Sequence, residues 1–226
     1  MIDFHTHILP GVDDGSRHLT DSLEMLRMEQ RQGVDLVALT PHFYSSQQSP
    51  EKFLERRERA WERLLDAWEE GMPQLLLGAE VQYFDSIENL SNLSSLCIQG
   101  TSLLLLEMPF APWEQRVIRA VQEIQEFGEI QVVLAHIDRY LSFGDNHRLL
   151  ESLRRSGVLM QVNASFFEGW FHRRKALSMF RKGEFQLLGS DCHNLDARKP
   201  NWASVPEDVK QSVSRNGRKL LKQYQL

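Results

Sequence analysis

Short runs of Val, Leu and Ile alternate with longer amphipathic stretches along the whole chain. Seven of these apolar runs predict strands, at residues 2–5, 34–39, 75–79, 102–106, 130–135, 158–162 and 185–188. Several are apolar at nearly every position, which is typical of parallel strands that are buried on both faces. Strands that alternate with helices indicate a parallel α/β fold, either a closed barrel or a doubly wound sheet.

The stretches between the strands carry helix signals. Ser49 followed by Pro50 predicts a capped helix, and Asp21 with Glu24 predicts a capping box at the start of the preceding helix. Further helices are predicted at residues 113–127, 146–155, 171–181 and 207–223. No repeat or Pro/Ser/Gly-rich linker divides the sequence, so we expect a single domain over residues 1–226.

Composition excludes several classes of protein. The hydrophobic content of 42% and charged content of 25% are those of a soluble globular protein. A net charge of −5 is unfavourable for nucleic-acid binding. Cys97 and Cys192 cannot form a disulfide framework. Residues 1–3 lack the basic and apolar regions of a secretory signal, so we expect none. The longest strongly apolar run, residues 103–106, is far shorter than the roughly 20 residues of a membrane span. We therefore expect a cytoplasmic protein without membrane insertion.

Histidines and carboxylates follow the predicted strands at the points where the strands end. They are His5, His7, Asp14, His42, Glu80, Glu107, His136, Asp191 and His193. In parallel α/β folds the carboxyl ends of the strands meet on one face, so these side chains should lie close together. Five imidazoles and four carboxylates could not be desolvated together without cations.

Each piece of this pattern is weak when it is taken alone. His5 and His7 are two residues apart, and any strand places such a pair on one face whether or not they bind a metal. Glu107 could pair with an arginine, and His136 could be a core histidine. Their coincidence at six strand ends favours a metal site. Imidazole and carboxylate ligands without thiolate suit Mn²⁺, Fe or Zn²⁺, and nine ligands are enough for two ions, with three possible.

The segments that carry these residues resemble a known family. In order and spacing, D-F-H-T-H, V-D-D-G, T-P-H, G-A-E, L-E, A-H-I-D-R-Y and S-D-C-H-N-L-D-A-R-K-P resemble the polymerase-and-histidinol-phosphatase (PHP) superfamily. Within it, the chain is most similar to the bacterial manganese-dependent protein-tyrosine phosphatases associated with capsule and exopolysaccharide synthesis.

The resemblance implies a fold, a cofactor and an activity. The fold would be a distorted seven-stranded (β/α) TIM-like barrel of the PHP type. Its carboxyl-end face would hold a trinuclear manganese site, and the family's ligands fall on the same nine residues. The implied substrate is phosphotyrosine on a protein, in particular on the C-terminal tail of a bacterial tyrosine kinase.

Two arginines lie where they could bind the phosphate. Arg139 and Arg198 follow His136 and His193 in loops that should border the metals, and arginine is the side chain best suited to bidentate phosphate recognition. Alternatively they could be solvated or form salt bridges with Asp138 or Asp196. The resulting hypothesis is that a hydroxide bridging two ions attacks phosphorus while both arginines neutralise the phosphate oxygens.

A second group of basic residues occurs in the run 172–175, which opens the helix after the sixth strand. Such a run is typical of a solvated face, although it could also guide an acidic peptide.

Other functions are compatible with parts of the pattern. Cys192 and Arg198 fit the C-x5-R spacing of cysteine-dependent tyrosine phosphatases, but residues 193–197 contain no glycine and carry the carboxylate of Asp196, which would repel phosphate. A histidinol-phosphate phosphatase would use the same site on a smaller substrate. A TatD-like nuclease also begins with H-x-H, but the acidic net charge and the V-D-D-G segment fit it poorly. A metal-containing regulatory protein without turnover is disfavoured by the complete ligand set.

Overall fold

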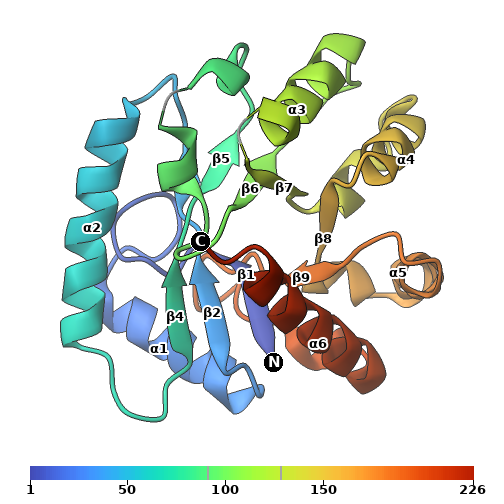
Figure 1. The fold of residues 1–226 in the computed structure, drawn as a ribbon. Coiled ribbons are helices and arrows are strands. Elements are labelled where there is room, and N and C mark those ends of the chain that lie inside the picture. The colour runs from blue at the N-terminus through green and yellow to red at the C-terminus, as the bar shows by residue number, and fades with distance from the viewer. Residues whose placement is uncertain (91, 128) are drawn as a thin grey trace.

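The structure is a computed structural model that describes residues 1–90, 92–127 and 129–226. The described residues form nine strands and six α-helices, which Figure 1 shows as a curled parallel sheet with helices around it. The strands are β1 (Ile2–Thr6), β2 (Leu36–Leu39), β3 (His42–Phe43), β4 (Gln74–Leu77), β5 (Glu80–Gln82), β6 (Leu103–Glu107), β7 (Gln131–Leu134), β8 (Leu159–Asn163) and β9 (Leu187–Gly189). The helices are α1 (Leu19–Arg31), α2 (Pro50–Asp66), α3 (Gln115–Phe127), α4 (Asn146–Arg155), α5 (Trp170–Arg181) and α6 (Glu207–Gln223). None of the helices in these ranges combines the length and apolar character that crossing a bilayer requires.

The strands form two sheets in which every pair is parallel. One sheet has the order β1-β2-β4 and the other the order β3-β5-β6-β7-β8-β9. The segment after β9 lies beside β1, because the Asp191 N–H donates to the His5 carbonyl over 2.8 Å and the His7 N–H donates to the Cys192 carbonyl over 2.9 Å. The predicted α/β class is therefore confirmed as a mixed α/β fold with a curled parallel half-barrel sheet. The distorted seven-stranded TIM-like barrel stays a prediction.

Two of the seven predicted strands are each followed by a second short strand that the sequence does not predict. The chain leaves β2 at Leu39 and starts β3 at His42, and it leaves β4 at Leu77 and starts β5 at Glu80. Pro41 has no N–H to donate to a ladder, but its carbonyl accepts the Glu80 N–H over 3.0 Å. These breaks move both chain segments from one sheet to the other and place His42 and Glu80 opposite each other in register.

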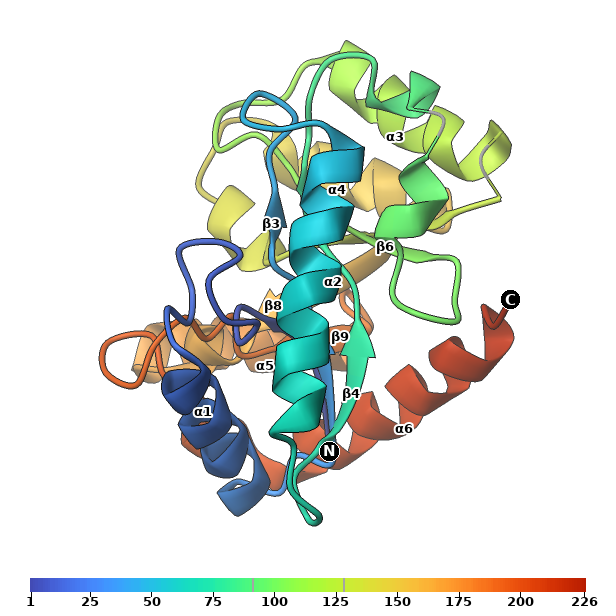
Figure 2. The ribbon, with the colours of Figure 1, turned by 90° about the vertical axis from the view of Figure 1, so that its left-hand side faces the viewer.

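The strands bury side chains on both faces, as the apolar runs predict. In β6, Leu104 and Leu106 belong to the large core under the surrounding helices, whereas Leu103 and Leu105 belong to a second apolar group. This alternation is the period of two that a strand imposes. The second group packs against α6, which Figure 2 shows extending away from the strands toward the C-terminus.

Gly217 of α6 makes the closest approach to this second group. A Cβ at that position would lie 2.5 Å from the Phe4 ring, so the helix can pack against β1 only where it has no side chain.

Helix starts follow the predictions in part. The Ser49 hydroxyl caps α2 by accepting the Lys52 N–H over 3.5 Å, with Pro50 in the first turn. The predicted capping box is wrong, because α1 starts at Leu19 and Asp21 lies inside its first turn. Among the described residues no side chain caps the start of that helix, and the hydrogen bonds there join backbone groups.

Candidate metal centre

All nine side chains that the sequence predicts as metal ligands lie together at one edge of the sheets. They are His5, His7, Asp14, His42, Glu80, Glu107, His136, Asp191 and His193, and contacts of 3.8 Å or less link them into one cluster. Seven are buried, while Glu107 is 18% exposed and Asp14 is 66% exposed. The structure therefore gives the predicted metal site one continuous location.

The Glu80 carboxylate lies at the middle of this cluster. Its Oε2 atom is 3.1 Å from His5 Nε2, 3.3 Å from His7 Nε2 and 2.9 Å from His42 Nδ1. Its Oε1 atom is 2.8 Å from His136 Nε2. One buried carboxylate thus faces four imidazoles, a position from which it can contact more than one cation.

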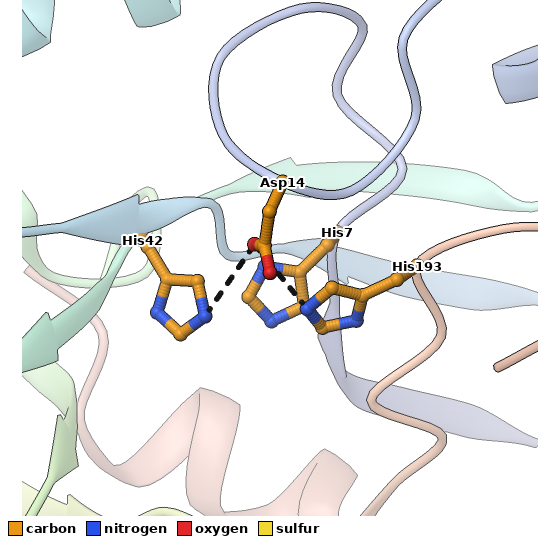
Figure 3. A group of neighbouring side chains, drawn as sticks. All are labelled: His7, Asp14, His42 and His193. Carbon is orange, nitrogen blue, oxygen red and sulfur yellow. Dashed lines mark ion pairs between the residues drawn. The ribbon is translucent and has the colours of Figure 1, made fainter.

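Asp14 brings a carboxylate to the cluster from the loop after β1. Figure 3 shows it between His42 and His193, with the His7 ring beside them. Asp14 Oδ1 is 3.8 Å from His42 Nε2 and 3.6 Å from His193 Nε2. Ligand atoms of these four residues all lie within 4.8 Å of one another, which is close enough for them to share one ion.

Several buried polar atoms of the cluster have no hydrogen-bond partner among the described residues. They are Glu80 Oε2, His42 Nδ1, His136 Nδ1 and His193 Nε2. His42 Nδ1 and Glu80 Oε2 approach to 2.9 Å without hydrogen-bond geometry, and burial of such atoms is costly unless something binds them. Imidazole and carboxylate donors without thiolate suit Mn²⁺, Fe and Zn²⁺. The residues present therefore fit divalent metal ions.

The pKa values of three histidines are shifted by the cluster. Burial by itself would lower the pKa of His7, but the adjacent Asp13 carboxylate holds it well above its usual value. Burial also opposes the charged form of His136, but its contacts with Glu107 and Glu80 raise that pKa to about 9. Burial and the nearby His7 lower the pKa of His193 to about 3. Ions that bind His7 and His136 must displace protons, so metal affinity should increase with pH.

Asp13, which the sequence does not single out, also contacts two of the predicted ligands. Its buried Oδ2 atom is 2.6 Å from His7 Nδ1 and accepts the His42 N–H over 2.9 Å. Burial opposes its charge, yet the contact with His7 holds the pKa of Asp13 far below its ordinary value. The Asp13 carboxylate therefore contacts the ring of His7 and the backbone N–H of His42, two of the predicted ligands. Asp13 and Asp14 are adjacent in the V-D-D-G segment. The surrounding sequence does not show which of them orients a histidine and which is the predicted ligand.

Replacing Asp13 with Asn should weaken Mn²⁺ binding about 10- to 100-fold, because carboxylates that orient ligating histidines have effects of that size. The dissociation constant for Mn²⁺, measured by titration of the metal-free protein, checks this. Asp66→Asn, at an exposed position at the end of α2, is the matched control. A dissociation constant of Asp13→Asn within twofold of the wild-type value would show that Asp13 has no such role.

Two polar residues of β8 make hydrogen-bond contacts with residues of the cluster. The Gln161 Oε1 atom accepts the His136 N–H over 2.7 Å and lies 3.2 Å from His5 Nδ1. The Asn163 amide donates to Asp191 Oδ2 over 2.9 Å. Both residues are buried in β8; Gln161 lies within the apolar strand predicted at 158–162, and Asn163 directly follows it. A polar residue within or next to an apolar run was the sequence feature that could have indicated these two contacts.

The two predicted phosphate-binding arginines both reach the cluster through Asp191. Arg139 donates to Asp191 Oδ2, and Arg198 Nη2 donates to Asp191 Oδ1 over 2.9 Å. Their side chains are 36% and 40% exposed, so each guanidinium keeps N–H groups accessible to solvent. Among the described residues their carboxylate partner is Asp191, and the alternative pairs with Asp138 or Asp196 do not form.

The structure argues against Cys192 as a nucleophile. Its thiol is buried and lies 3.9 Å from Glu29 Oε1. Burial, together with the charges of Glu29 and Asp3, raises the pKa of this thiol well above its usual value. A nucleophilic cysteine needs an accessible thiolate, so the C-x5-R spacing to Arg198 does not indicate cysteine chemistry here.

The chain matches known proteins over nearly its whole length. Residues 1–223 match the family described as "Capsular polysaccharide synthesis, CpsB/CapC". The chain is 30% identical to tyrosine-protein phosphatase YwqE of Bacillus subtilis over 205 residues, which are 88% of this chain and 79% of YwqE. It is 29% identical to tyrosine-protein phosphatase CpsB of Streptococcus pneumoniae over 215 residues, covering 88% of this chain and 86% of CpsB.

The fold is also that of a solved relative. The crystal structures of YwqE and of CpsB from Streptococcus pneumoniae, described as unique metal-dependent tyrosine phosphatases, include a chain that matches with a TM-score of 0.82 at 24% identity. The match covers 100% of this chain and 96% of the other, and at this identity it shows the fold. The family match, which spans almost every residue and agrees with the 30% identity to YwqE, shows that this chain belongs to the CpsB/CapC family.

Proposed function

We propose that this chain hydrolyses phosphotyrosine in proteins as a metal-dependent phosphatase. The observation that carries the proposal is the cluster around Glu80, in which buried imidazole and carboxylate atoms face one another without hydrogen-bond partners. Membership of a family whose relatives are named tyrosine-protein phosphatases supports the substrate.

The nine clustered residues would hold two or three Mn²⁺ ions, with Fe or Zn²⁺ as alternatives. Three overlapping groups of donors support this number: His7, Asp14, His42 and His193; His5, His7 and Glu80; and His42, Glu80 and Glu107. When bound, such ions neutralise phosphate charge and lower the pKa of water, so that hydrolysis can proceed near neutral pH. The proposed ligand set is His5, His7, Asp14, His42, Glu80, Glu107, His136, Asp191 and His193.

The two arginines would bind the phosphate group. Asp191 holds both guanidinium groups at the edge of the cluster, and their exposed N–H groups can donate to the phosphate oxygens. A tyrosine leaving group has an unperturbed pKa near 10, so its departure depends less on a proton donor than that of an alkyl alcohol. The chain's own contribution is therefore to orient phosphate with Arg139 and Arg198.

The wider setting is part of the same proposal. The family description supports a role in capsule or exopolysaccharide synthesis, where the substrate would be the C-terminal tail of a bacterial tyrosine kinase in the cytoplasm. The family match over residues 1–223 supports a single PHP-type domain over 1–226. The strand order and the contacts between β1 and the segment after β9 support a seven-stranded barrel framework.

Initial rates on a phosphotyrosine peptide and on histidinol phosphate test the proposal. Rates are measured after EDTA treatment, after Mn²⁺ is returned, and after treatment with iodoacetamide. We expect turnover of the peptide that EDTA abolishes, Mn²⁺ restores and iodoacetamide leaves unchanged, because Cys192 is buried. Metal-dependent turnover of histidinol phosphate alone would contradict phosphotyrosine as the substrate. Turnover that resists EDTA and is abolished by iodoacetamide would contradict the mechanism.

A further inference from the structure

The first part of α5 is exposed to solvent. Residues 170–175 are all exposed, and we call them the α5 patch. Six helical residues make about 1.7 turns at 3.6 residues per turn, so exposure at every position means that side chains reach solvent all around this segment. Trp170 is 66% exposed and Phe171 is 79% exposed. The first buried residue of the helix is Ala176.

The α5 patch is also strongly basic. Arg173, Arg174 and Lys175 take part in none of the ion pairs that the described residues form, whereas the exposed Arg116 and Arg218 each pair with a carboxylate. α5 contains no acidic residue, although the chain as a whole carries a net charge of −5. The patch therefore carries three basic groups outside the ion pairs of the described residues, with Glu168 as the acidic residue just before it, and such a region attracts an anionic partner.

Contacts within the α5 patch hold its rings and charges in place. The Trp170 and Phe171 rings make an edge contact with centroids 4.7 Å apart. The Arg174 guanidinium lies over the Trp170 ring at 5.7 Å, and His172 stacks on Phe166 at 5.7 Å. Exposed aromatic faces beside guanidinium groups can bind both aromatic side chains and anionic groups of a peptide.

Two connections link the start of α5 to residues of the metal centre. Asn163, at the end of β8, donates to Asp191, and a short 3-10 helix (Ala164–Phe167) joins it to α5, as Figure 1 shows for the path from β8 to α5. The loop that carries Arg198 continues to Asn201, whose amide donates to Glu168 over 2.9 Å, just before α5. A peptide that enters the metal centre can therefore extend over the patch.

We propose that the α5 patch binds the segment of a phosphoprotein substrate that flanks the phosphotyrosine in the metal centre. This segment would carry acidic residues or further phosphate groups. The inference rests on the proposed function. An anionic membrane is a weaker match, because a membrane-bound helix needs a long apolar face, and Ala176 and Met179 of α5 are buried against the protein.

Kinetics on matched substrates test this inference. The full chain, loaded with Mn²⁺, is assayed on two phosphotyrosine peptides that differ only in having glutamates or serines beside the phosphotyrosine, and on p-nitrophenyl phosphate. The test variant is Arg173→Gln/Arg174→Gln/Lys175→Gln. The control, Arg215→Gln/Lys219→Gln/Lys222→Gln, removes the same charge from exposed positions of α6. Circular dichroism and metal content confirm that each variant is folded and loaded.

We expect the wild type to favour the glutamate-flanked peptide by about tenfold in kcat/KM, mainly through KM, as charge complementarity predicts. The α5 variant should lose this preference and keep its rate on p-nitrophenyl phosphate, and the α6 variant should behave as the wild type. A wild type without preference, or an α5 variant that retains it, would overturn the inference while the proposed function stands. No turnover of any substrate by the wild type would instead reject the proposed function.

Sedimentation with phosphatidylserine vesicles separates the membrane alternative. Vesicle binding that the α5 variant loses, with an unchanged preference between peptides, would assign the α5 patch to a membrane and overturn the inference.

Discussion

Glu80→Gln should lower kcat/KM for a phosphotyrosine peptide by at least about 10³-fold, even in excess Mn²⁺, because it removes a charge on which the metal site depends. The Glu80 carboxylate lies within 3.3 Å of the imidazoles of His5, His7, His42 and His136. Glutamine has nearly the same shape, so the substitution removes the negative charge and leaves the packing. The bound Mn²⁺ per chain, measured by mass spectrometry after gel filtration, should fall together with the rate.

Glu62→Gln is the matched control for this variant. Glu62 lies at an exposed position of α2, and its substitution should change neither the metal content nor the rate. If Glu80→Gln bound as much Mn²⁺ as the wild type and turned over the peptide within twofold of it, Glu80 would not be a ligand.

Arg139→Ala should lower kcat/KM for the same peptide on the order of 10²- to 10³-fold, the cost of removing one donor to a reacting oxyanion. The metal content should be unchanged, because Asp191 keeps its hydrogen bonds from Arg198 and Asn163. Arg139→Lys should recover only part of the rate, since an ammonium group cannot make the bidentate contact of a guanidinium.

Arg148→Ala, at an exposed position of α4, is the control for the loss of one positive charge. Equal kcat/KM values for Arg139→Ala and the wild type would rule out the phosphate contact. A loss of bound metal in Arg139→Ala would instead show that this arginine acts by holding Asp191 in place.

The sequence alone located most of the proposed site because its information is local. An apolar run ends where its strand ends, and in a parallel sheet those ends share one edge. His5, Glu107 and His136 could therefore be placed together without any knowledge of their neighbours, and the structure brings them into the same cluster. The alternation of strands and helices determined the α/β class for the same reason.

The contacts within that edge depended on residues far apart in the chain. The sequence could not show that His42 and Glu80 open new strands in register, because this follows from breaks in two separate segments. Nor could it distinguish Asp13, which is buried against His7, from Asp14, which is 66% exposed and faces His42. Both are aspartates in one loop, and only the packing around that loop separates them.

Nor could the sequence identify the residues that hold the predicted ligands in place. Gln161 touches His5 across 156 positions of sequence, and Arg139 reaches Asp191 across 52. The chain's local patterns thus determined which residues stand at the strand ends. The tertiary structure decided which of them face each other, which are held by a buried partner, and which remain open to solvent, because those contacts form only when distant segments pack.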